Sequence, residues 1–241
     1  MFKNKKLITA LVLLVIIFVA GIFILTTNDK EETVLPKLPK TDYKSPINFE
    51  KLWEENTDIV AYLKIPALEI EYPVLHKKGE DEYYMHRNLQ QEYAFHGELF
   101  IQDYNKDDFS DPINIIYGHN MNDGSYFGKL QKHYSSEEWL NENSEILLYL
   151  PDREIKYEVM AAVPYSSMHI LHYYSFDKPR MTESFIESVY SKRSINSAFN
   201  RNGKLTDNDP ILVLSTCLSG GGDKRYLVVA QEIQNSFEGD I

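Results

Sequence analysis

Short apolar or alternating runs separated by turn residues occupy most of the chain, and they predict β-strands. Eight runs have strand length, and several alternate apolar with polar side chains, as strands with one buried face do. The predicted strands cover residues 59–65, 68–75, 98–102, 113–117, 145–150, 153–164, 211–216 and 226–232. This number and spacing favour a closed barrel or a sandwich of mixed α/β content.

Three stretches have helical features instead. Ser45 and Pro46 suggest an N-cap and a first helical position for a short amphipathic helix that runs to residue 55. A second helix is predicted over 135–142, opened by Ser135 or Ser136. The third covers 182–193 with Thr182 as N-cap, and it interrupts the strands as a large insertion.

The N-terminal pattern differs from the rest of the chain. Residues 7–27 carry no charge, and 21 residues at about 1.5 Å each span about 31 Å, which predicts a transmembrane helix. The lysines of tail 1–6 predict a cytoplasmic N-terminus and an extracellular remainder. A cleaved signal peptide is the competing interpretation, disfavoured by the length and by the missing small-x-small site. A stalk over 28–45 and one catalytic domain over 46–241 would follow.

Charge and cysteine content narrow the range of possible functions and of stabilising interactions. The chain has 25 Lys and Arg against 36 Asp and Glu, and without the three lysines of the tail the balance is 22 against 36, a formal charge of −14. Such a surface does not bind nucleic acid by neutralising phosphates. A single cysteine excludes an internal disulfide, so stability must come from the core.

That cysteine, Cys217, ends a buried strand and is a candidate nucleophile, although a free cysteine also packs as a small hydrophobe. Arg225 begins the next strand, where its guanidinium is placed either to bind an oxyanion or simply to be solvated. His119 follows the strand at 113–117 through Gly118, in a polar loop typical of a cleft rim. The other six histidines lie in polar or mixed contexts and are predicted to be surface or loop residues: His76, His86, His96, His133, His169 and His172.

These residues together resemble the sortase family, and most closely its class B members. The likeness rests on Leu214-Ser215-Thr216-Cys217 with Arg225, on Tyr117-Gly118-His119-Asn120-Met121, and on Trp53-Glu54-Glu55-Asn56 and Ile70-Glu71-Tyr72-Pro73-Val74. It extends over most of residues 47–234. Cysteine, histidine and arginine at this spacing form a strong signal, whereas any one of them alone would be weak.

The resemblance implies a mainly β protein with helices: an eight-stranded β-barrel with an N-terminal helix and a long helix between the sixth and seventh strands. It implies a cysteine transpeptidase that forms a thioester with Cys217, uses His119 as general acid and base, and uses Arg225 to stabilise the oxyanion and substrate. The implied partners are exported proteins with a C-terminal sorting signal and an amino group of a peptidoglycan precursor. The implied location is the cell membrane, reached through the N-terminal helix.

A few residues near the three candidate catalytic side chains are further candidates for binding substrate or orienting His119. Ser215 lies on the same strand face as Cys217 and either contacts substrate or fills a small core position. By resemblance, Thr216 and Tyr173 are further substrate-binding candidates. What orients His119 stays open between Asn120 and a backbone carbonyl, as does any role for Asp223 after the glycines at 220–222.

No metal or cofactor is predicted, because no Cys/His cluster has ligand spacing and the aspartates near residue 105 lack the pattern of a calcium loop. Two other functions remain open: a thiol hydrolase with the same residues, and a non-enzymatic, membrane-tethered binding domain.

Overall fold

The computed structural model describes residues 35–236, except for 169, 175–177, 179 and 221. The chain divides into two compact units, Met1–Leu35 and Pro36–Ile241, and the fold described below is that of the second. Its α-helices are α2 (Phe49–Glu55), α3 (Leu130–Tyr134), α4 (Glu137–Glu142), α5 (Ile170–Tyr173) and α6 (Met181–Tyr190). Its strands are β1 (Ile59–Ile65), β2 (Ile70–Leu75), β3 (Leu99–Phe100), β4 (Ile113–Tyr117), β5 (Glu145–Tyr149), β6 (Glu154–Tyr165), β7 (Ala198–Phe199), β8 (Ile211–Cys217) and β9 (Arg225–Asn235).

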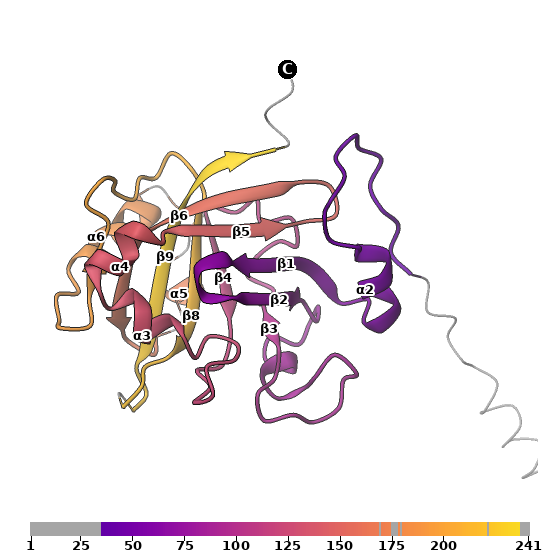
Figure 1. Ribbon diagram of the computed structural model, residues 1–241, viewed down its shortest axis with the longest axis horizontal. Coiled ribbons are helices and arrows are strands. Elements are labelled where there is room, and N and C mark those ends of the chain that lie inside the picture. Colours follow the sequence, from indigo (N-terminus) through magenta and orange to yellow (C-terminus); the bar gives the residue numbers. More distant parts are fainter. Residues whose placement is uncertain (1–34, 169, 175–177, 179, 221, 237–241) are drawn as a thin grey trace, which may run out of the picture. The chain divides into compact units, whose positions relative to one another are not determined.

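The strands form a closed barrel (Figure 1). Among the described residues they make one sheet in the order β5-β1-β2-β3-β4-β8-β9-β6-β7, and β5 also pairs with β6. This last pairing closes a ring of eight strands and leaves the two-residue β7 attached to β6. The predicted eight-stranded barrel with helices, and with a helical insertion after the sixth strand, is confirmed.

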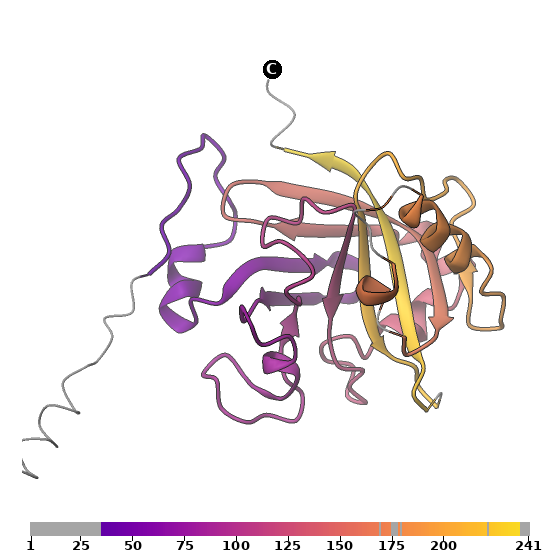
Figure 2. The same ribbon diagram turned by 180° about the vertical axis from the view of Figure 1, so that it is seen from behind.

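Strands β4, β8 and β9 are mostly apolar in their central parts because both of their faces are covered there. Toward the barrel interior, Leu214 and Val228 join a cluster that also contains Leu63. On the opposite face, Val213 and other side chains pack with Phe185 of α6 in a second cluster. Figure 2 shows α5 and α6 on this outer side of β8 and β9. A strand buried on both faces needs a continuous apolar run, which is what the sequence has at 211–214.

Two of the three predicted helix starts differ in the structure. Helix α2 is capped by Asn48, whose side chain accepts from Lys51 N at 3.0 Å, while Ser45 closes a turn before it by accepting from Ile47 N. Helix α6 begins after Arg180, which has a φ of +66°, so Thr182 lies in its first turn and is not its cap. Ser136 caps α4 as expected. For α2 and α4 the backbone amide that the capping side chain reaches decides the boundary, whereas α6 begins without a side-chain cap.

Within the part of the chain that the structure describes, no helix is long and apolar enough to cross a membrane. This finding corrects the predicted localisation, which was a single-pass membrane protein with a cytoplasmic N-terminus and an extracellular domain. The anchor predicted over residues 7–27 and the first part of the predicted stalk, residues 28–34, lie outside the described residues.

Candidate active site

The candidate site forms where β8 ends and β9 begins. Cys217 is the last residue of β8, and the antiparallel register places it opposite Arg225, the first residue of β9. Arg225 Nη1 donates to Cys217 Sγ at 3.2 Å, and the cysteine is exposed. The hairpin between the two strands therefore brings together two of the three predicted catalytic side chains, with the thiol open to solvent.

His119 reaches the same place from the neighbouring strand. Strand β4 runs parallel to β8 with Tyr117 opposite Ser215, and Gly118 N continues this pairing by donating to Ser215 O at 3.1 Å. Asn120 then donates from Nδ2 to Cys217 O and to Ser219 Oγ, both at 2.8 Å. The loop that carries His119 is thus fastened directly to the backbone of the cysteine.

The ring of His119 is oriented by a backbone carbonyl. Its Nε2 bonds to Met85 O at 2.8 Å. Because a carbonyl only accepts, this nitrogen carries the hydrogen, and in the neutral ring Nδ1 keeps the available lone pair. Of the two orienting groups left open by the sequence, the carbonyl holds His119, while Asn120 holds the cysteine loop. A carbonyl 34 positions away has no sequence signature, which is why Met85 was not predicted.

The environment of His119 favours its neutral form. Burial is the largest cause that lowers its pKa below the ordinary value of 6.5. The nearby His86 and Arg225 lower this pKa further, and the Met85 hydrogen bond opposes them. The ring centroids of His86 and Phe95 lie 5.3 and 5.9 Å from that of His119. At neutral pH the group is therefore mainly an uncharged imidazole, suited to accept a proton.

A pocket of about 150 Å³ adjoins the arginine. It is lined by Glu82, Met85, Phe100, Gln102, Tyr117, Ser166, Ser167, Met168, Ile170, Ser215 and Arg225. One wall comes from the segment between β6 and α5, through Ser166, Ser167 and Met168. The pocket is large enough for one or two peptide side chains, and it opens beside the arginine that contacts the thiol.

The secondary candidates occupy different places. Ser215 is 3% exposed and lines the pocket. Thr216 is fully buried, and its Oγ1 has no hydrogen-bond partner among the described residues. Tyr173 is 62% exposed at the end of α5, where its ring packs edge-on against Tyr174, and it is not part of the pocket lining. The sequence grouped these three residues, and the structure separates them.

The loop after the cysteine contains Asp223, which is exposed. Gly220 and Gly222 have φ values of +70° and +62°, a region that glycine adopts without strain. In the described part of the chain no hydrogen bond or ion pair joins Asp223 to the cysteine, the histidine or the arginine. Among the same residues no group of three or more His, Cys, Asp or Glu side chains is arranged to hold a metal ion.

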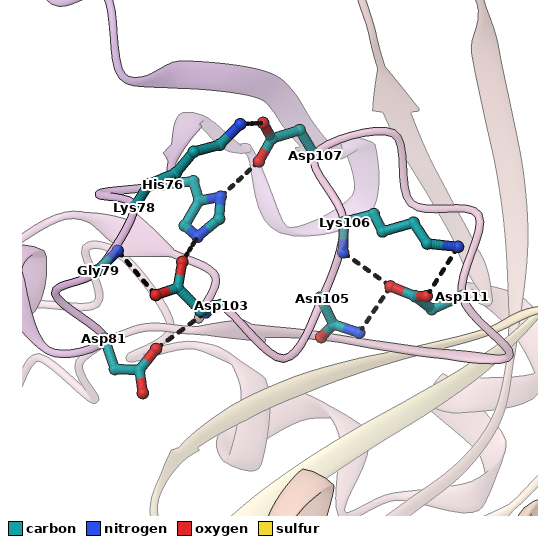
Figure 3. Close-up of polar contacts among 9 residues, drawn as sticks. All are labelled: His76, Lys78, Gly79, Asp81, Asp103, Asn105, Lys106, Asp107 and Asp111. Carbon is teal, nitrogen blue, oxygen red and sulfur yellow. Dashed lines mark hydrogen bonds and ion pairs between the residues drawn. The ribbon is translucent and has the colours of Figure 1, made fainter. Parts of the chain in front are cut away.

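A second histidine is more deeply buried than its polar sequence context suggests. His76 lies in the loop after β2, one of the two positions predicted for it, and it is only 6% exposed. Figure 3 shows why: its ring lies between two carboxylates, with Nε2 2.9 Å from Asp103 Oδ1 and Nδ1 bonded to Asp107. These aspartates come from the loop between β3 and β4, so a remote segment covers the histidine.

Comparisons with known proteins agree with this geometry. The family model described as "Sortase domain" matches residues 63–233. Sortase B of Listeria monocytogenes is 35% identical over 167 residues, which are 67% of this chain and 63% of that protein. Sortase B of Staphylococcus aureus is 26% identical over 97% of this chain and 99% of its own length.

Solved structures give the same result. The X-ray structure of Clostridium perfringens sortase B has a TM-score of 0.63 at 26% identity, covering 78% of this chain and all of that one. A 2.0 Å crystal structure of Staphylococcus aureus sortase B has a TM-score of 0.66 at 25% identity, covering 77% of this chain and 86% of that one. The match to the Listeria protein spans less than two thirds of that protein.

Proposed function

The chain belongs to the sortase family, and we propose that it acts as a class B sortase: a cysteine transpeptidase that cleaves a C-terminal sorting signal of exported proteins and joins them to an amino group of peptidoglycan. The observation that carries this proposal is the junction of three strand ends. An exposed thiol meets a guanidinium at 3.2 Å, and the loop of a mainly neutral histidine is bonded to the backbone of the same cysteine.

In the proposed first half-reaction, the Cys217 thiol gives its proton to His119 Nδ1, and Sγ forms a bond to the carbonyl carbon of the scissile peptide. The negative charge that develops on the carbonyl oxygen is stabilised by Arg225. Its guanidinium has several donors and stays charged at any working pH, so it can bind the oxyanion while remaining beside the sulfur.

Collapse of this intermediate breaks the carbon–nitrogen bond. The proton held on His119 Nδ1 passes to the departing amine, and a thioester remains on Cys217. In the second half-reaction, the incoming amine attacks the thioester carbon and loses a proton to Nδ1. The carbon–sulfur bond breaks, and the proton returns to the thiolate. A lowered histidine pKa supports the second step, because the base must be neutral when the amine arrives.

We assign the pocket beside Arg225 to side chains of the sorting signal that precede the scissile bond. It lies against the arginine, and Ser215 in its wall precedes the nucleophile by two residues on the same strand. Direct substrate contacts of Thr216 and Tyr173 stay predictions, and Thr216 would act only through its buried position.

The test uses the full-length chain with a panel of quenched sorting-signal peptides, with and without an amine acceptor, and mass spectrometry of the products. We expect amine-ligated product from the wild type and none from Cys217→Ala. Arg225→Ala should lower kcat by about 10²- to 10³-fold, the usual cost of one oxyanion donor. Lys224→Ala is the matched control, since Lys224 is the exposed neighbour of Arg225.

Two results would change the assignment. Hydrolysed product alone, at every acceptor concentration, would make the protein a thiol hydrolase with the same residues. Turnover that survives Cys217→Ala, or a wild type that processes no peptide and whose Cys217 resists alkylation in the folded state, would contradict the proposal altogether.

A further inference from the structure

A buried carboxyl group that the proposed reaction does not use lies next to the segment whose Met85 carbonyl bonds to the histidine. Glu98 directly precedes β3 and is only 6% exposed. Burying a carboxyl is costly unless polar groups face it. Its side chain is faced by the Leu89 backbone amide, by the Tyr126 side chain and by His96, the residue two positions before it. These groups belong to two different segments, and both segments contact His119.

The first segment contains Met85, whose carbonyl orients the His119 ring. Glu98 N donates to Tyr84 O at 3.0 Å, and Ala94 N donates to His86 O at 3.0 Å, so residues 94–98 hold the peptides on both sides of Met85. Gly97 shows how close this packing is. It has a φ of +53°, and a Cβ there would collide with the Tyr84 and Met85 carbonyl oxygens.

The second segment is the loop that carries His119 itself. Tyr126 forms a β-bridge with Asn120, and Phe127 N donates to His119 O at 3.0 Å. The Tyr126 ring is stacked between Tyr72 and His96, with centroid separations of 4.6 and 5.1 Å. Burial is the largest cause that raises the pKa of the Tyr126 hydroxyl, and the charge of the nearby Glu98 carboxyl adds to it. The Glu98 carboxyl therefore lies close to the residue that pairs with Asn120.

We propose that Glu98 is a positioning residue for His119: its carboxyl fixes Tyr126 and the loop that carries the histidine, while its backbone fixes the segment whose Met85 carbonyl orients the histidine ring. This inference rests on the proposed function for its catalytic consequence. Its structural content, the orientation of His119, does not depend on any substrate.

The titration of Glu98 should be visible in the pH dependence of turnover. Burial raises the pKa of Glu98 to about 7, against the opposing effects of His96, the Leu89 amide and Tyr126. Two further titratable groups, Tyr72 and Asp123, act on Tyr126. The ionised carboxyl is the better acceptor for the Tyr126 hydroxyl, so this contact weakens as pH falls through about 7. The pH profile of kcat should contain a step there that depends on Glu98.

The experiment compares Glu98→Ala, Glu98→Gln and Tyr126→Phe in the full-length chain, with Glu92→Gln as the matched control, because Glu92 is an exposed carboxyl in the same segment. We measure kcat and KM for the peptide and follow the His119 ring resonances by NMR across pH. Glu98→Ala should lower kcat by about 10- to 100-fold with KM within about twofold, the effect of a misplaced catalytic group. It should also shift the His119 titration.

Glu98→Gln keeps one acceptor oxygen, so it should lose less activity than Glu98→Ala and should remove the step near pH 7. Tyr126→Phe keeps the ring stacking and removes only the hydroxyl. If Glu98→Ala does not fold, this variant tests whether the Tyr126 hydroxyl helps to position His119. Unchanged kcat and an unchanged His119 titration in these variants would overturn the inference, whatever happens to their melting temperatures. A wild type without turnover would reject the proposed function, and the His119 titration would still judge Glu98.

Discussion

Two histidines at the ends of neighbouring parts of the barrel show how the surroundings decide what one side chain does. His119 and His76 both follow a strand, and His76 is buried while His119 is half-buried. His119 lies beside Arg225 and His86, so burial and positive charge lower its pKa. His76 lies between Asp103 and Asp107, and these hydrogen bonds, that of Asp107 first, raise its pKa against the effect of burial.

The hydrogen bonds of the two histidine rings distinguish His76 from His119 as clearly as the neighbouring charges do. Each ring nitrogen of His76 is bonded to a carboxylate that only accepts, so the ring is held as a doubly donating imidazolium (Figure 3). His119 uses one nitrogen for a backbone carbonyl and keeps a lone pair on the other. A histidine with both nitrogens bonded to acids serves as a fixed cation, whereas a neutral one with one nitrogen committed is ready to exchange a proton.

The largest expected difference is in turnover. His119→Ala should lower kcat by about 10²- to 10⁴-fold, the range that a general acid and base contributes, while the free energy of unfolding changes by less than about 1 kcal/mol. Steady-state kinetics and urea unfolding of the same preparation measure both quantities. The comparison would break if His119→Ala kept more than a tenth of the wild-type kcat.

The opposite pattern is expected for the second histidine. His76→Gln removes the cation from between Asp103 and Asp107 and should cost about 1–2 kcal/mol of unfolding free energy, less than for a fully buried pair because both carboxylates are partly exposed. The kcat of the folded protein should change by less than about threefold. Lys78→Gln is the control, since its ion pair with Asp107 at 2.9 Å is far more exposed. An equal loss of unfolding free energy in both variants would mean that the buried His76 stabilises the fold no more than the exposed Lys78 ion pair does.

The third prediction concerns pH. A raised folded-state pKa means that His76 stabilises the fold fully below its ordinary value of 6.5, and that this contribution is lost as pH rises through the folded value. The pKa of Asp107 is lowered, mainly by the His76 bond, so its contribution is lost as pH falls through that lower value. In NMR titrations the two histidines should therefore have midpoints on opposite sides of 6.5. Both midpoints on one side would contradict the comparison.

The sequence singled out His119 as a candidate site residue but did not predict that His76 is buried between two carboxylates, and the difference has a physical reason. Strands β1 and β4 were predicted to the residue, because an alternating or continuous apolar run records burial locally. The meeting of Cys217 and Arg225 followed from a hairpin eight residues apart. His119 followed from its place after β4.

Other features depend on contacts between distant segments and have no local pattern. His76 is followed by Lys77, Lys78 and Gly79, a polar context that gives no sign that the β3–β4 loop covers it. The two-residue strand β7 is too short to show a period. Glu98 is the first residue of the strand predicted over 98–102, and only the folded structure brings it next to Tyr126 and the Met85 segment.

The smallest expected effect tests how much of the His119 shift comes from its neighbours. His86→Asn removes a titratable ring whose centroid lies 5.3 Å from that of His119, and its side-chain amide can still donate to Phe95 O, the present partner of His86. The titration midpoint of His119 should rise but stay below 6.5, because burial is the larger cause. His133→Asn serves as the control, since His133 packs against Trp139. An unchanged His119 midpoint in His86→Asn would assign the lowered pKa of His119 to burial and Arg225. A midpoint above 6.5 would mean that neighbouring charge, and not burial, keeps His119 neutral.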